Sequence, residues 1–158
     1  MVADRMRPLG LRRLTAGERG LAAEVFGAGL DAGRVRILAT PVWNRAFVAG
    51  PALIVWPART APLDFAAEPL ARQAVFVHEL THVWQAQKGV RLLAAKLRAG
   101  DGAASYAYDL ERGPAFAALN IEQQAMVVEH AFVASRGGAT PHPAALYAEA
   151  APAWRRSA

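Results

Sequence analysis

The sequence has no cysteine among its 158 residues. Disulfide bonds, thiolate metal sites and a cysteine nucleophile are therefore excluded. Lysine is scarce as well, since Lys88 and Lys96 are the only two and arginine carries nearly all the positive charge. No uncharged apolar run approaches the length of a membrane span, and the N-terminus lacks the apolar segment of a secretory signal. We expect a cytoplasmic protein, or one that is exported without a classical signal peptide.

The composition is that of a globular protein. Hydrophobic residues make up 54% of the chain and charged residues 20%, which is enough apolar material for one domain with a sizeable core. The net charge of +5 comes from arginines scattered along the sequence, with no cluster interleaved with aromatic residues. This pattern favours a solvated basic surface over a nucleic-acid partner.

Hydrophobic periodicity predicts an α+β fold in three segments. Residues 1–13 are expected to form a flexible basic arm, residues 14–136 the folded domain, and residues 137–158 a C-terminal extension with one short helix near 144–150 and a frayed end. The domain should contain helices at about 15–26, 67–88, 90–98 and 114–135, strands at 34–38, 46–49 and 52–56, and an extended or irregular stretch at 106–110. Gly50-Pro51 should join the last two strands as a hairpin.

Thr15 begins the first of these helices with a recognisable signal. A threonine at the N-cap followed three residues later by a glutamate, here Glu18, is typical of a capping box. Gly27 and Gly29 should end this helix.

The helix expected at 67–88 carries the pattern His78-Glu79-Leu80-Thr81-His82. Two histidines at positions i and i+4 share one helix face, with Cβ atoms roughly 5–6 Å apart, so that one metal ion can bridge them. Glu79 is rotated away from that face and can instead act as general base on a metal-activated water. His-Glu-x-x-His also arises by chance, but here it lies mid-helix, with no proline and no charge other than Glu79 between the histidines.

The third metal ligand must come from elsewhere, because hydrolytic zinc sites commonly use three protein ligands and one open position. The metzincin continuation would need glycine at position 85 and histidine at position 88, where the chain has Gln85 and Lys88. In the helix expected at 114–135, Glu122 and Glu129 are two turns apart, and geometry alone allows either. We favour Glu122, since the small Ala125 one turn later would permit close approach of the two helices.

Other polar residues are weaker candidates for the site. Glu129 or His130 could orient a metal ligand from a second layer of contacts. Tyr106 and Tyr108 could donate hydrogen bonds to a developing oxyanion, although both could equally be packing residues with the hydroxyl directed outward.

Three stretches resemble one known family. They are His78-Glu79-Leu80-Thr81-His82-Val83-Trp84-Gln85, Tyr106-x-Tyr108-x-Leu110 and Glu122-Gln123-Gln124-Ala125. They resemble small bacterial zinc metallopeptidases known as Vgr-related proteins, which are similar to the metallopeptidase-like domain associated with extracellular contractile injection systems. Together with Leu14-Thr15-x-Gly17-Glu18 and Val35-x-Ile37, the resemblance covers roughly residues 14–135.

The resemblance implies a minimal gluzincin-like zincin, in which a small sheet of about three strands packs on the motif helix and a glutamate-bearing helix. It implies Zn²⁺ as cofactor, His78, His82 and Glu122 as ligands, and Glu79 as catalytic base. It also implies an association with a bacterial secretion system. The substrate is left open by the resemblance.

The resulting hypothesis is a zinc-dependent metallopeptidase acting on a peptide or protein substrate. The strand at 52–56 could form the edge of its cleft and pair with an extended substrate. One alternative is a protein that binds the metal but is catalytically inactive, namely a zincin-like accessory or binding module of a secretion or contractile injection system. Another is a basic nucleic-acid-binding domain in which the motif is fortuitous.

Overall fold

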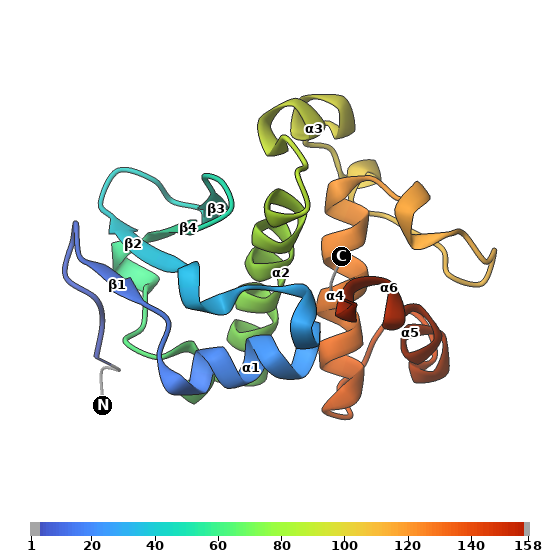
Figure 1. Ribbon diagram of the computed structural model, residues 1–158, viewed down its shortest axis with the longest axis horizontal. Helices are drawn as coiled ribbons and strands as arrows, with labels where there is room; N and C mark the ends of the chain where they lie inside the picture. The colour runs from blue at the N-terminus through green and yellow to red at the C-terminus, as the bar shows by residue number, and fades with distance from the viewer. Residues whose placement is uncertain (1–3, 157–158) are drawn as a thin grey trace.

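The computed structural model describes residues 4–156. Within this range the α-helices are α1 (Ala16–Phe26), α2 (Leu70–Gln87), α3 (Leu92–Ala99), α4 (Ile121–Ser135), α5 (Ala144–Ala150) and α6 (Pro152–Arg155). The strands are β1 (Leu11–Arg13), β2 (Arg36–Thr40), β3 (Phe47–Val48) and β4 (Leu53–Pro57). Figure 1 shows the sheet, α2 and α4 as successive layers, with α5 and α6 beyond α4. The predicted α+β class is confirmed.

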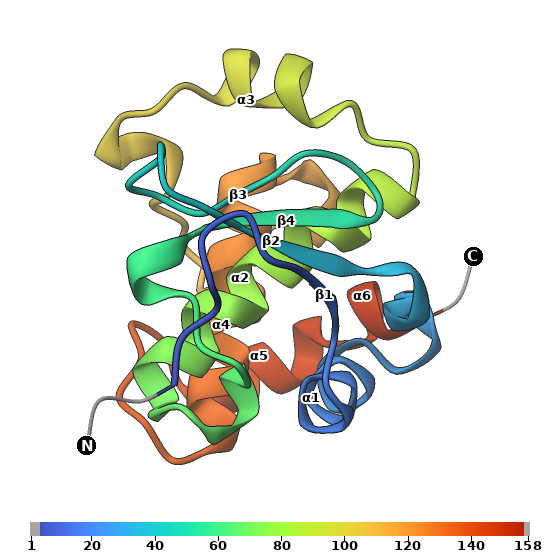
Figure 2. The same cartoon turned by 90° about the vertical axis from the view of Figure 1, so that its left-hand side faces the viewer.

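The described strands form one sheet in the order β1-β2-β4-β3. β2 and β4 are parallel, whereas β1 and β3 are antiparallel to their neighbours. The predicted hairpin is present between β3 and β4, with Phe47 opposite Val55. β4, which we expected to form the cleft edge, instead lies between β2 and β3. Its backbone is paired on both sides, so that β3 is the edge strand beside it; Figure 2 shows the sheet in front of α2 and α4.

The fourth strand, one more than expected, comes from the segment predicted to be a flexible arm. Leu11 pairs with Leu38 of β2, and the Met6 amide donates to the Ala61 carbonyl at 2.9 Å. Met6 is buried in the core. The arm prediction is therefore wrong for residues 5–13, because an apolar side chain and a strand pairing fix them to the fold. Residues 1–3 lie outside the described residues.

Glu18 joins α1 to two other parts of the chain. The predicted capping box is present, since the Thr15 hydroxyl accepts from the Glu18 amide and the Glu18 carboxylate accepts from the Thr15 amide. That carboxylate also accepts two hydrogen bonds from Arg12, both 2.7 Å, and one from the Phe65 amide at 2.9 Å. Glu18 is fully buried. One side chain thus links β1, α1 and the turn before α2.

Replacing Glu18 with alanine should lower the free energy of unfolding by about 3–5 kcal/mol, the usual result of removing one partner from a buried ion pair. Arg12 and the Phe65 amide would lose their acceptor. The matched control is Glu24→Ala, because Glu24 also lies on α1 and pairs through two bonds with an arginine, Arg136, but is exposed. Glu24→Ala should lower the free energy of unfolding by about 1 kcal/mol or less. Urea denaturation of the metal-free protein would measure the unfolding free energy of both variants. Equal losses of stability would contradict the structural role assigned to Glu18.

α2 is the central element of the fold. It begins at Leu70 after Pro69, three residues later than predicted, because Phe65–Ala67 forms a separate 3-10 turn. Phe76, Val77, Leu80 and Val83 are all inaccessible to solvent. Their burial follows from the position of α2 between the sheet and α4. In the described range no helix, α2 included, is long and apolar enough to cross a membrane.

The expected C-terminal extension packs into the same core. Tyr147 of α5 and Trp154 of α6 are each 2% exposed. Gly29 follows α1, and a Cβ atom there would lie 2.4 Å from the Trp154 carbonyl oxygen, so that only glycine fits beside α6. The prediction of a frayed terminus is therefore wrong for residues up to 156, and residues 157–158 lie outside the described residues.

Candidate functional site

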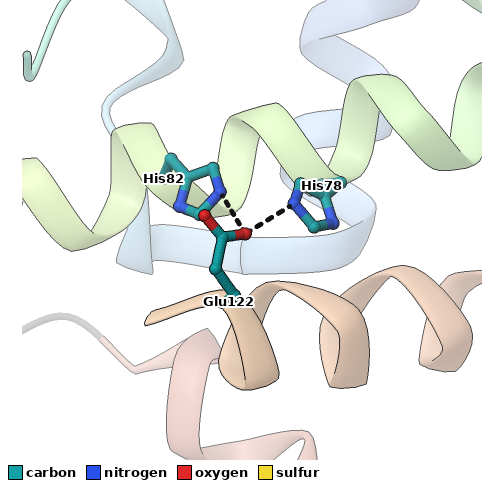
Figure 3. Close-up of side chains that lie close together, drawn as sticks. All are labelled: His78, His82 and Glu122. Atoms are coloured by element: carbon teal, nitrogen blue, oxygen red, sulfur yellow. Dashed lines mark hydrogen bonds and ion pairs between the residues drawn. The ribbon is translucent and has the colours of Figure 1, made fainter. Parts of the chain in front are cut away.

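The two histidines of the motif project from α2 toward α4, as their helical spacing predicted. Their ring centroids are 5.0 Å apart. Glu122 points at them from the first turn of α4, and Figure 3 shows one carboxylate oxygen of Glu122 facing a nitrogen of each ring. Glu122 Oε2 is 3.3 Å from His78 Nε2 and 3.3 Å from His82 Nε2. The structure therefore brings the three predicted ligands together.

Asn120 determines where α4 begins and so where Glu122 lies. Its side chain accepts from the Gln123 amide, and the Gln123 side chain accepts from the Asn120 amide, which forms a capping box. The prediction that this helix starts near Pro114 is wrong, because the capping box begins it at Ile121 and residues 116–118 form a 3-10 turn. A carboxylate in the first turn of a helix is also favoured by the helix dipole.

The distances from Glu122 to the two imidazoles are those expected for ligands of a tetrahedral metal ion. In proteins zinc lies about 2.0–2.2 Å from histidine nitrogens and carboxylate oxygens, so two ligand atoms at a tetrahedral angle are about 3.3–3.6 Å apart. The two distances of 3.3 Å from Glu122 agree with this spacing, and all three ligand atoms lie within 4.8 Å of one another. In the part of the chain that the structure describes, this cluster of histidine and carboxylate groups is the one able to hold a metal ion.

A second layer of contacts orients both imidazoles. Glu129 Oε2 lies 2.9 Å from His78 Nδ1, and Gln85 Oε1 lies 2.8 Å from His82 Nδ1. Both oxygens act as acceptors, so Nδ1 carries the proton in each ring and Nε2 is the nitrogen left to face a metal. The Gln85 amide is fixed in turn, because its nitrogen donates to the Ile121 carbonyl and to Gln124.

Sequence reasoning missed the role of Gln85. The residue served there to exclude a metzincin and as part of the family resemblance, although its position three residues after His82 places it on the same helix face. Gln85 is fully buried. An amide side chain one helical turn after a histidine ligand is the sequence signal that could have identified the role of Gln85.

Two carboxylates raise the pKa of His78. Burial alone would lower this pKa, but hydrogen bonds with Glu122 and Glu129 outweigh the effect and raise it to about 9. Conversely, burial would raise the pKa of Glu122, yet its hydrogen bonds with His78 and His82 hold it below the usual range. In the metal-free protein His78 is therefore an imidazolium between two carboxylates.

Zinc affinity should depend on pH because the ion must displace this proton. The raised pKa means that the protonated ring stabilises the metal-free fold fully below pH 6.5 and that this stability is lost as pH rises through about 9. Zinc affinity should thus rise about tenfold per pH unit between about 6.5 and 8. Chelator competition would measure the slope. Glu129→Gln removes one carboxylate charge and should reduce the slope at the upper end of this range, whereas a pH-independent wild-type affinity would contradict the prediction.

Glu79 presents an unpartnered oxygen beside the cluster. Among the described residues nothing hydrogen-bonds to Glu79 Oε2, although the atom is buried. Burial raises the pKa of this carboxyl, and the charges of His82 and His78 oppose that shift. A carboxylate with a free acceptor at the wall of a cavity has the arrangement required of a general base.

The cluster opens onto a cavity of about 760 Å³. Its walls come from β3 and the segment before it, from β4 and the 3-10 turn after it, from α2, α3 and α4, and from the loop after α3. The large apolar side chains that line it are Trp43, Phe47, Val48, Trp56, Val75, Leu92, Leu93, Ile121 and Met126. Trp43 and Leu93 are also among the most exposed large apolar residues of the described chain. The cavity therefore presents apolar surface directly beside the polar cluster.

The structure separates the two tyrosines. Tyr106 lines the cavity. Tyr108 is not among the lining residues, and its hydroxyl contacts His130 Nδ1 at 2.5 Å and the Tyr147 hydroxyl at 2.6 Å. Burial and the contact with Tyr147 raise the pKa of Tyr108 above its ordinary range. Tyr108 thus connects α4 to α5 and does not face the cluster.

His130 likewise lies away from the cluster. Burial lowers its pKa, and its side-chain hydrogen-bond partner is Tyr108 rather than either motif histidine. Neighbouring residues on a helix point in directions about 100° apart, so Glu129 and His130 cannot both face α2 in the same way. Of the two residues expected to support a ligand, Glu129 is the one that contacts it.

Comparisons with known proteins give two findings. The chain is 36% identical over 134 residues to the type VI secretion system spike protein VgrG2b of Pseudomonas aeruginosa, a match that covers 77% of this chain. It spans only 13% of the length of that protein. Its structure is similar to the effector domain of P. aeruginosa VgrG2b, with a TM-score of 0.68 and 33% identity over 87% of this chain and 80% of the other. No family model matches the chain. The predicted resemblance is confirmed at the level of homology to a secretion-system component.

Proposed function

The chain belongs to the family of the VgrG2b effector domain, and from this premise we propose that it is a zinc metallopeptidase that hydrolyses peptide bonds. One arrangement carries the proposal: His78, His82 and Glu122 form a ligand set of zinc dimensions, with the unpartnered oxygen of Glu79 beside it. Homology to a spike-protein effector domain supports the further proposal that the chain acts as a secretion-system effector.

His78 Nε2, His82 Nε2 and Glu122 Oε2 would hold the zinc ion. When bound there, zinc would polarise the scissile carbonyl and lower the pKa of a water molecule toward about 7. The chemistry of the donor set supports zinc over magnesium or calcium, because imidazole nitrogens suit zinc whereas the other two ions prefer oxygen ligands.

Glu79 would move the proton. Its Oε2 atom accepts a proton from the attacking water as the new C–O bond forms and the carbonyl π electrons move onto oxygen. The same atom then gives the proton to the amine nitrogen as the C–N bond breaks. Glu79 thus ends the cycle ionised, as it began.

Tyr106 is the tyrosine that we retain for the carbonyl oxygen, since it lines the cavity. Its hydroxyl would donate a hydrogen bond as negative charge develops there. Tyr108 is not assigned this role, because its hydroxyl is already engaged with His130 and Tyr147.

β3 and the apolar walls indicate how a peptide would bind. β3 is an edge strand, so its outer backbone groups are available to an extended chain. Phe47, Val75 and Leu93 would contact the substrate side chains beside the scissile bond. We therefore propose substrates with bulky apolar residues next to the cleaved bond.

Metal removal and restoration test the proposal. The zinc-loaded protein should cleave an unfolded protein substrate and, in a randomised peptide library, should prefer bonds flanked by apolar residues. Treatment with a chelator should abolish cleavage, and an equimolar amount of zinc should restore it. Mass spectrometry of the products would locate the cleaved bonds.

The outcomes separate the proposal from its alternatives. Zinc binding without cleavage of any library peptide would contradict peptidase activity and favour a zincin-like binding module. Failure to bind zinc would contradict the metal site itself.

A further inference from the structure

Lys96 of α3 lies against the far side of the candidate metal site. Its ammonium nitrogen is 3.6 Å from Glu122 Oε1, the carboxylate oxygen that does not face the histidines. Asp101 Oδ1 is also 3.6 Å from the ammonium nitrogen. Lys96 lines the same cavity as Glu79 and Tyr106.

The two oxygens of Glu122 therefore have different partners. Oε2 lies between the two imidazoles, whereas the charged partner of Oε1 among the described residues is Lys96. Glu122 is 2% exposed, so water offers its carboxylate little alternative. A buried carboxylate oxygen without a partner is costly, and its pairing with an ammonium group should fix the orientation of the carboxylate, with one oxygen toward Lys96 and the other toward α2.

We propose that Lys96 is a positioning residue of the metal site, which holds Oε1 of Glu122 so that Oε2 is presented as a single ligand atom. The inference rests on the zinc site of the proposed function. It makes α3 a part of the site, although α3 supplies no ligand of its own.

Two effects of the lysine on metal affinity oppose one another. The ammonium charge repels a metal cation, while its contact with Oε1 orients the ligand. Lys96 is 44% exposed, and solvent and salt screen its charge, so the repulsion is weakened. Removal of a residue that orients a ligand commonly weakens metal binding about 10–100-fold. Orientation should therefore dominate.

Zinc affinity of a Lys96→Met protein tests the proposal, measured by chelator competition at fixed pH and salt. The matched control is Lys88→Met, which replaces the other lysine of the chain, located at the end of α2, and causes the same change of net charge. Lys96→Met should bind zinc about 10–100-fold more weakly. Lys88→Met should retain wild-type affinity.

Two additional measurements distinguish a positioning role of Lys96 from a general effect on folding. Lys96→Arg keeps a cation that can reach Oε1 and should restore most of the affinity, and circular dichroism should show that every metal-free variant keeps the wild-type secondary structure. Unchanged or tighter zinc binding in Lys96→Met would overturn the proposal. This result would leave the peptidase proposal standing, because that proposal fails only if the wild-type protein does not bind zinc or does not cleave peptides.

Discussion

Replacement of Glu79 by glutamine is expected to leave zinc bound and to lower kcat/KM for peptide cleavage by about 10²–10⁴-fold, the usual contribution of a general base. The substitution preserves the size of a side chain that is 8% exposed, so the surrounding packing should persist. Glu79 is not one of the three clustered ligands, and the loss should therefore be confined to proton transfer.

Zinc content and kcat/KM should be measured on the same preparation of the E79Q protein. Glu24→Gln is a suitable control, because Glu24 is an exposed glutamate on α1 that pairs with Arg136 and, through its backbone carbonyl, with Arg155. It should retain both zinc and activity. Peptide cleavage at the wild-type rate by E79Q would show that another group takes the proton, whereas loss of zinc would place Glu79 among the ligands.

The part of the site that was predictable from the sequence depends on local periodicity. The spacing of His78 and His82 determines a shared face on any helix, whatever surrounds it. The capping box of Thr15 and Glu18 is local in the same sense, and it is present. The choice of Glu122 over Glu129 needed one further argument, the small Ala125, and the structure places Glu122 within the cluster. That Ala125 is fully buried agrees with this argument.

The remainder depends on contacts between distant segments, which no local pattern encodes. The sequence predicts that Arg12 is a surface charge, whereas in the fold it pairs with Glu18. The sequence likewise predicts that Met6 belongs to a flexible arm, whereas in the fold it is buried in the core. Tyr106 and Tyr108 are equivalent in sequence, and only the position of α5 directs Tyr108 toward Tyr147. Lys96 is similar, because nothing near it in sequence indicates that it lies beside Glu122.

Alanine substitution of the two glutamates of α4 should give unequal losses of zinc affinity. Four-ligand zinc sites bind with about 10–16 kcal/mol, so one ligand contributes about 3–4 kcal/mol, and Glu122→Ala should weaken binding about 10²–10³-fold. Of the two histidines, Glu129 contacts only His78, through Nδ1. Glu129→Ala should therefore weaken zinc binding about 10–100-fold. The same chelator competition would rank the two variants and the wild-type protein.

The ranking decides which carboxylate completes the site. Both substitutions remove one negative charge from the same helix and one partner from His78, so their effects on net charge and on the pKa of this ring act in the same direction. The differences that remain are the contacts of Glu122 with His82 through Oε2 and with Lys96 through Oε1. A larger loss in E129A than in E122A would therefore reverse the assignment of ligand and supporting residue, and it would also remove the basis for a positioning role of Lys96, which touches only Glu122 of the pair.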